Sequence, residues 1–158
     1  MNSLFSRAAV AGLLMGVSVF AGAADALKSQ EPPQGAKVFI VSPADGATVD
    51  KTFTVKFGIE GMGLKPAGDA TPHTGHHHLL VDVDKEPAAD QPLPTTLMPE
   101  NNAPLPAGPQ VLHFGKAQTE ATITLAPGKH TLQLVLGDRF HVPFMPSVES
   151  QKITVQVK

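Results

Sequence analysis

Apolar side chains recur at every second position in each strongly patterned segment of this chain. Phe53, Val55, Phe57 and Ile59 alternate with polar or small residues. This is the period of a β-strand that buries one face and exposes the other. From residue 27 to residue 158, no segment carries a capped apolar stripe of helical period over ten residues or more. The pattern therefore predicts an all-β fold.

Six further short segments are alternating or continuously apolar, as expected of strands, and are separated by turn residues such as Pro127-Gly128. They are Val38–Val41, His76–Val83, Val111–Phe114, Thr119–Leu125, Leu132–Leu136 and Ile153–Val157. About seven short strands with turn signals between them indicate an antiparallel β-sandwich of immunoglobulin-like architecture. Cysteine and tryptophan are absent, so the likeness to an immunoglobulin domain is one of architecture only.

The first 26 residues have the layout of a secretory signal peptide. Arg7 precedes an apolar run from Ala8 to Phe20, and small residues follow it. The run is too short to span a bilayer, which takes about 20 apolar residues. We expect cleavage between Ala23 and Ala26, a periplasmic or secreted mature protein, and no membrane span in the rest of the chain.

The mature chain is expected to contain one domain. Residues 27–36 carry paired prolines and no periodicity, which predicts a flexible leader, and residues 37–158 are long enough for a single β-sandwich domain. The glycines and prolines of residues 61–72 predict a loop. Residues 84–109 are so dense in proline that they can form neither a helix nor a central strand. This second loop starts at the end of the histidine-rich strand and could cover it.

The composition excludes several classes of function. The formal net charge is −2 and the lysines are scattered, which argues against a nucleic-acid partner. Without cysteine there are no disulfides, thiolate metal sites or cysteine nucleophiles. The chain also lacks a Gly-x-Ser-x-Gly nucleophile motif, a phosphate loop and a helical His-Glu-x-x-His motif. Imidazole is the functional group that remains.

Four of the seven histidines lie between His73 and His78. Successive side chains of a strand point to opposite faces, so His76 and His78 share a face and can close on one metal ion. We expect that face to lie off the core. The alternative to metal binding is that both rings are solvated and form hydrogen bonds with water or a neighbouring loop. His77 shares the other face with Leu79, which favours a histidine at the edge of the core, satisfied by a backbone carbonyl.

Two histidines on one strand need further donors to complete a metal site. His113 and His141 are the imidazoles available on other elements, so the predicted ligands of one copper or zinc ion are His76, His78, His113 and His141. Met145 is a conceivable copper donor. His130 is expected to be structural, and His73, in the preceding loop, is a reserve ligand.

Three classes of function fit these residues. The first is a periplasmic metal-binding or carrier protein for copper or zinc. The second is a module without metal that recognises a partner protein or a ligand of the cell envelope. The third is a small metalloenzyme, such as a superoxide dismutase on a related sandwich, which needs an open coordination position and partners that orient its imidazoles. Glu120 and Asp138 are candidates for such partners, or surface charges.

Residues 37–158 resemble a bacterial family, domain of unknown function 4399. The segments that carry the resemblance are Gly75–Asp82, His113–Glu120, Pro127–Leu134, Gly137-Asp138 and His141–Pro143. The resemblance implies a secreted or periplasmic β domain and brings no settled activity. The family often has a histidine directly after the proline that matches Pro143, where this chain has Phe144.

Overall fold

The computed structural model describes residues 28–83 and 103–158. Within these ranges the chain forms strands and no helix, which confirms the all-β prediction. The expected signal peptide and residues 84–102 of the proline-dense loop lie outside the described residues. In the part that is described, there is no helix long and apolar enough to cross a membrane.

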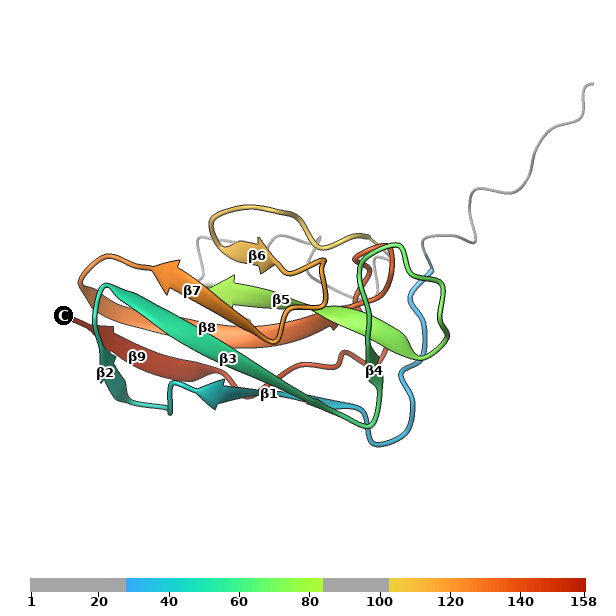
Figure 1. The fold of residues 1–158 in the computed structure, drawn as a ribbon, viewed down its shortest axis with the longest axis horizontal. Helices are drawn as coiled ribbons and strands as arrows, with labels where there is room; N and C mark the ends of the chain where they lie inside the picture. The colour runs from blue at the N-terminus through green and yellow to red at the C-terminus, as the bar shows by residue number, and fades with distance from the viewer. Residues whose placement is uncertain (1–27, 84–102) are drawn as a thin grey trace, which may run out of the picture.

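Nine strands follow one another along the described chain (Figure 1). They are β1 (Lys37–Ser42), β2 (Ala47–Val49), β3 (Thr52–Glu60), β4 (Gly63–Leu64), β5 (Thr74–Val81), β6 (Val111–His113), β7 (Glu120–Thr124), β8 (Gly128–Gly137) and β9 (Ile153–Val157). Seven correspond to the predicted strands. β2 and β4 escape the prediction because strands of three and two residues are too short to show a period. The sequence predicts a loop for all of residues 61–72, and β4 shows that two of these residues form a strand instead.

The smaller sheet has three antiparallel strands in the order β1-β3-β7. Its central strand, β3, buries Val55 and Phe57 and exposes Thr54 and Lys56, as its alternating sequence predicts. On the exposed face, the hydroxyl of Thr54 lies 3.1 Å from that of Thr122 on β7. One face of this sheet is thus available for a core.

The larger sheet has six strands, β2-β9-β8-β5-β4, with β6 paired to β5. Two of its pairings, β2 with β9 and β4 with β5, are parallel, so the prediction of a purely antiparallel fold is wrong for these edges. The chain explains the difference: β2 and β4 flank β3 in sequence but pair in the other sheet. At β2 and at β4 the chain leaves the smaller sheet for a few residues. There it runs in the same direction as its partner strand in the larger sheet, so the pairing is parallel.

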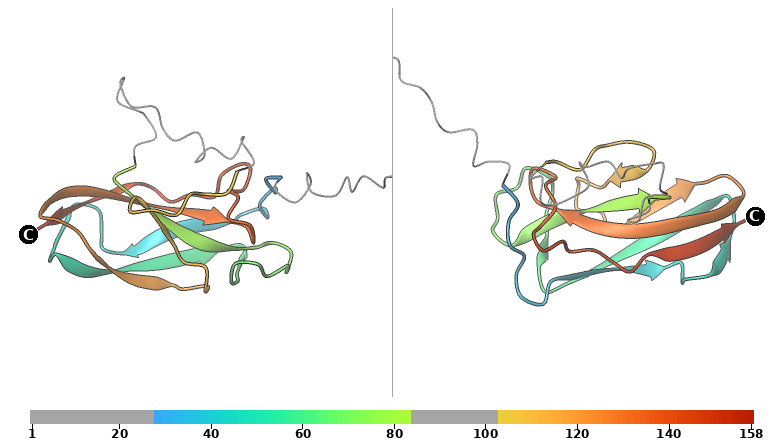
Figure 2. Two further views of the ribbon diagram at one scale, coloured as in Figure 1. Left: turned by 90° about the horizontal axis from the view of Figure 1, so that it is seen from above. Right: turned by 180° about the vertical axis from the view of Figure 1, so that it is seen from behind.

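The main core contains side chains from both sheets, whose strands Figure 2 shows from above and from behind. Leu79 of β5, Leu134 of β8 and Val155 of β9 are fully buried in it, together with Val55 of β3. Burying a side chain of this size stabilises the fold by about 1.5–3 kcal/mol. The protein therefore has a substantial apolar core that includes no metal ligand candidate.

A second, smaller apolar cluster lies on the opposite face of the larger sheet. It consists of Leu80, Leu105, Val111 and Val135. Leu105 belongs to the described end of the proline-dense loop, and its backbone N–H donates to the carbonyl of His141 at 2.8 Å. This part of the loop therefore lies over the face of β5 that carries His76 and His78.

The described part of the predicted leader is attached to the domain at Gln30. Its carbonyl accepts a hydrogen bond from Met145 N at 2.9 Å, and its side-chain Nε2 donates to Asp138 Oδ2 at 3.0 Å. Gln30 thus contacts the loop that follows β8. The flexibility of residues 27–36 stays a prediction.

Candidate metal centre

Alternation along β5 separates the three consecutive histidines as predicted. His77 faces the main core, where its ring lies 5.1 Å from that of Phe57, centroid to centroid. His76 and His78 lie on the outer face of the larger sheet, but they are 0% and 1% exposed. The two rings therefore lie off the main core, as expected, but they are buried and not solvated. The two rings are covered by the segment around Leu105, by β6 and by the loop after β8. None of these segments is adjacent to β5 in the sequence.

His113 reaches the pair because β6 runs antiparallel to β5. The register places His113 directly opposite His78, and directly opposed residues point to the same face of a sheet. The two rings stack with centroids 5.1 Å apart and an interplanar angle of 27°. His113 is itself exposed, so it forms the outer wall of the cluster.

His141 reaches the pair from the loop after β8, which Asp138 holds in shape. Asp138 is 2% exposed, and its Oδ1 accepts hydrogen bonds from the N–H groups of Phe140 and Val142 at 2.8 and 3.0 Å. Its carbonyl accepts from His141 N at 2.9 Å. His141 has a positive φ of 68°, which this loop imposes and which turns its half-buried ring back over β5.

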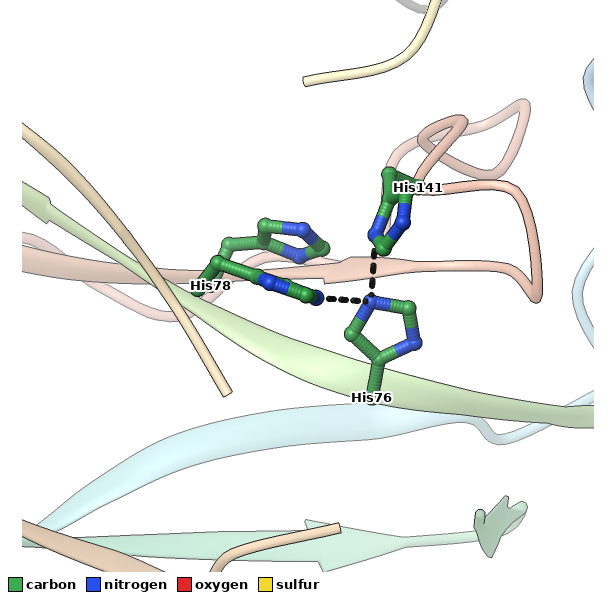
Figure 3. Close-up of side chains that lie close together, drawn as sticks. His76, His78 and His141 are labelled. Atoms are coloured by element: carbon green, nitrogen blue, oxygen red, sulfur yellow. Dashed lines mark hydrogen bonds between the residues drawn. The ribbon is translucent and has the colours of Figure 1, made fainter. Parts of the chain in front are cut away.

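The four imidazoles converge on one small volume, and Figure 3 shows His76, His78 and His141 around it. One ring nitrogen from each histidine lies within 4.8 Å of those from the others. His76 Nε2 is 2.9 Å from His141 Nδ1 and 3.1 Å from His113 Nε2. A tetrahedral zinc ion with four nitrogen ligands holds them about 3.3 Å apart. Small shifts of the rings would therefore give a metal its ligand distances.

Hydrogen bonding alone leaves this cluster unsatisfied. A nitrogen of a neutral imidazole carries either one hydrogen or one lone pair, yet His76 Nε2 faces two other ring nitrogens at hydrogen-bonding distance. It can therefore make one good hydrogen bond, and the other contact is left unsatisfied. The Nδ1 atoms of His76 and His78 are also buried without a partner among the described residues, although that of His76 points away from the contacts made by Nε2. A cation among the nitrogens would accept every lone pair that points inward.

The cluster also keeps its buried rings neutral. Burial, followed by the proximity of the other histidines, lowers the pKa of His76 to about 3 and that of His78 to about 2. Burial and His141 likewise lower the pKa of His113. A metal ligand must be a deprotonated imidazole. These three rings are therefore in their ligating form at neutral pH.

A known family covers all four of these histidines. Residues 55–158 match the family model described as Domain of unknown function (DUF4399), which is well over half of the chain. The chain belongs to the DUF4399 family. No curated protein and no solved structure matches the chain. The family assignment agrees with the resemblance of the histidine motifs and assigns no activity.

Two glycines of the DUF4399 motifs leave the space that two of the rings occupy. A Cβ on Gly115 would lie 2.5 Å from Cε1 and 2.6 Å from Nε2 of His113. A Cβ on Gly137 would lie 2.7 Å from Cε1 of His78. Neither glycine has a positive φ, so what each position requires is the absence of a side chain. The sequence signal is weak: Gly115 follows His113 by two residues, and Gly137 is four residues before His141.

Gly115→Ala is expected to weaken metal binding while leaving stability near that of the parent. The added methyl group collides with the free end of an exposed ring, which can swing away, and in doing so it moves His113 Nε2 out of the cluster. Loss or misplacement of one ligand should lower metal affinity at least about tenfold. Isothermal titration calorimetry and thermal unfolding of the apo-protein measure the two effects. Parental affinity in this variant would show that His113 is not a ligand.

One short loop, residues 65–68, connects the three segments that carry the histidines. Its backbone N–H groups donate to carbonyls in each of them, a feature that no sequence pattern indicates. The bonds run from Lys65 to Gly75, from Ala67 to Gly115 and from Gly68 to Arg139, each 2.9 Å long. The four ligand candidates are thus fixed relative to one another by backbone contacts outside the cluster.

The remaining histidines lie outside the group of four. His77 Nδ1 is 3.1 Å from the carbonyl of Gln118, which confirms its predicted place at the edge of the core. His130 is held by Asp82 at 2.7 Å and by the carbonyl of Ala126 at 2.9 Å, in line with a structural role. His73 is exposed.

The other candidate residues take structural positions. Glu120 is exposed on β7 opposite Lys56, as expected for a surface charge. The sequence suggests that Asp138 could bond directly to an imidazole. In the structure its carboxylate bonds to backbone N–H groups of the loop that carries His141. Phe144 is 1% exposed in the main core. The last loop therefore contributes a single imidazole, that of His141.

Proposed function

We propose that this protein binds one copper or zinc ion through His76, His78, His113 and His141, and that it acts as a metal-binding or carrier protein. One observation carries the proposal. Nitrogens from four imidazoles meet within 4.8 Å of one another, in an arrangement that hydrogen bonds alone cannot satisfy. Imidazole suits both metals. The group contains no thiolate or carboxylate ligand that would favour a different metal.

The location of the cluster favours a carried ion over a structural one. A structural zinc site supplies the folding energy of a domain that is unfolded without metal. Here the main core lies on one side of the larger sheet and the histidine cluster on the other. His113 is exposed and His141 half-buried, so two of the four ligands are within reach of another protein that gives or takes the ion.

Metal titration of the protein without a polyhistidine tag tests this function. We expect about one Cu(II) or Zn(II) per chain by elemental analysis and calorimetry. Because the ion binds the folded state, a hundredfold excess over the dissociation constant should stabilise that state by about 2.7 kcal/mol. A protein that binds neither ion would contradict the proposal and leave the module that recognises an envelope partner as the better account.

Export to the periplasm or the medium is part of the same proposal and rests on residues 1–26. Mass spectrometry of the protein from its native host is expected to find an N-terminus between Ala24 and Leu27. A mature protein that retains Met1 would contradict export by a cleaved signal peptide. The metal site would then have to be considered in a different compartment.

We also infer that the two sheets form an immunoglobulin-like sandwich. The support is that β3 and β7 of the smaller sheet and β5, β8 and β9 of the larger one contribute to one core. In such an architecture, the site would occupy the outer face of one sheet, near the end where the loops after β4 and β8 meet.

A further inference from the structure

The loop that supplies His141 is held at both of its ends by one residue of the leader. Gln30 precedes Asp138 by 108 residues in the sequence, and its Nε2 donates to Asp138 Oδ2 at 3.0 Å. Its carbonyl accepts a hydrogen bond from Met145 N at 2.9 Å. Asp138 and Met145 stand at the start and the end of the segment that contains His141. Gln30 therefore joins the two ends of this loop from outside it.

The backbone of His141 depends on contacts that hold this loop in shape. Its φ of 68° is one that residues other than glycine rarely adopt, and it persists where the surrounding structure imposes it. Asp138 Oδ1 accepts from the N–H groups of Phe140 and Val142, while Oδ2 accepts from Gln30. A buried carboxylate oxygen that loses its donor is costly. Loss of Gln30 therefore favours rotation of the Asp138 carboxylate away from the two N–H groups that shape the loop.

The leader is packed loosely beyond Gln30. An open cleft of about 540 Å³ lies between it and the segment that follows Met145, and residues 31–36 and 146–148 line this cleft. Gln30 itself is exposed. Exposed hydrogen bonds with few apolar contacts around them open more readily than those of a core. The leader can therefore leave the loop while both sheets stay folded.

We propose that Gln30 is a positioning residue of the metal centre and that the leader regulates metal affinity. The centre binds its ion more tightly while Gln30 is bound to Asp138 and Met145, and less tightly when the leader is displaced. This inference rests on the proposed function, because it concerns the ion held by the four histidines. The coupling is reciprocal: the ion must favour attachment of the leader by the same factor. Displacing the leader then releases the ion without any contact with the buried His76 and His78.

Two substitutions of Gln30 test the inference by calorimetric titration with Cu(II) or Zn(II). Gln30→Ala should lower metal affinity roughly tenfold, as expected when a ligand loses the partner that orients it. Gln30→Glu should lower it too, although its added negative charge alone would attract the cation. Gln34→Ala, an exposed change on the same leader, is the matched control and should keep parental affinity. Parental affinity in both Gln30 variants, or an equal loss in Gln34→Ala, would overturn the inference and leave the proposed function standing.

A second substitution at Asp138 should rescue Gln30→Glu. In Asp138→Asn/Gln30→Glu, the new amide oxygen can accept from the N–H groups of Phe140 and Val142, and the new amide NH₂ can donate to the carboxylate at position 30. The double variant has the same net charge as the parent. Its metal affinity should return to within about twofold of the parental value, since the two positions are coupled. No recovery over Gln30→Glu would show that this bond does not support the site.

Hydrogen exchange measured by NMR tests the reciprocal effect in the unsubstituted protein. The N–H of Met145 donates to the carbonyl of Gln30, so its exchange reports attachment of the leader. Saturation with Zn(II) should slow this exchange at least about fivefold. The N–H of Leu125, which donates to the carbonyl of Lys51 at 2.9 Å, is the control and should change little.

The outcomes of this experiment separate the inference from the proposed function. If zinc binds and exchange at Met145 is unchanged, or slows equally at Leu125, the inference is wrong and the proposed function stands. If neither zinc nor copper binds, both fail.

Discussion

His78→Leu is expected to bind Cu(II) or Zn(II) about 50- to 100-fold more weakly than the parent, because it removes one of four ligands from a site whose total binding energy is on the order of 10 kcal/mol. The same change should not destabilise the apo-protein. His78 Nδ1 is buried without a partner among the described residues, and removing an unsatisfied buried polar atom recovers about 1–3 kcal/mol. A leucine there would lie opposite Val135 and against the rings of His76 and His113.

His77→Leu is the matched control on the same strand. It removes an adjacent buried imidazole that faces the main core and bonds to the carbonyl of Gln118. We expect it to lose stability and to keep the parental metal affinity. Calorimetry with each metal and urea unfolding of both apo-proteins separate the two outcomes. Equal loss of metal binding in the two variants would mean that binding depends on the fold of β5 and not on the four-histidine cluster.

The apo-protein should lose stability steeply as the pH falls below about 6.5. His76 and His78 have pKa values of about 3 and about 2 in the folded state, against about 6.5 in the unfolded chain. Below pH 6.5 the unfolded chain takes up protons that the folded protein does not, so acid favours unfolding. Each ring contributes about 1.4 kcal/mol per pH unit. The two together should cost on the order of 4 kcal/mol between pH 8 and pH 5.

Other histidines modify this loss in predictable directions. Burial also lowers the pKa of His77, which adds to the loss in acid. Asp82 raises the pKa of His130 through a hydrogen bond, which opposes it, because protonated His130 stabilises the fold. Urea unfolding at a series of pH values measures the sum. His78→Leu should remove about half of the slope, and an unchanged slope would show that His78 is not the buried neutral ring described above.

The sequence predicts the strands and the face on which each histidine of β5 lies, because both follow from a period of two. It also narrows the remaining ligands to His113 and His141, since few imidazoles lie on other elements. It does not predict that His76 and His78 are buried. Their cover comes from the register of β6 on β5 and from the loop shaped by Asp138. Such contacts between distant segments leave no periodic signal.

The supporting glycines are unpredictable for a related reason. In the sequence, Gly115 and Gly137 look like ordinary turn and strand-end residues, and their role becomes visible only when the rings of His113 and His78 are in place. The loop of residues 65–68 acts through backbone groups, which every sequence provides. Geometry that depends on the backbone or on the absence of a side chain is therefore found only in the folded protein.

The alternation of β5 links metal loading to the quality of folding. A slip of one residue in the pairing of β5 would turn His77 towards the site and bring His76 and His78 into the main core, while Leu79 would leave it. A molecule with that error would lose its core packing and its ligand set together. Binding of an ion by all four histidines would therefore indicate that β5 has paired in its native register. Metal retention could then be used to select correctly folded variants.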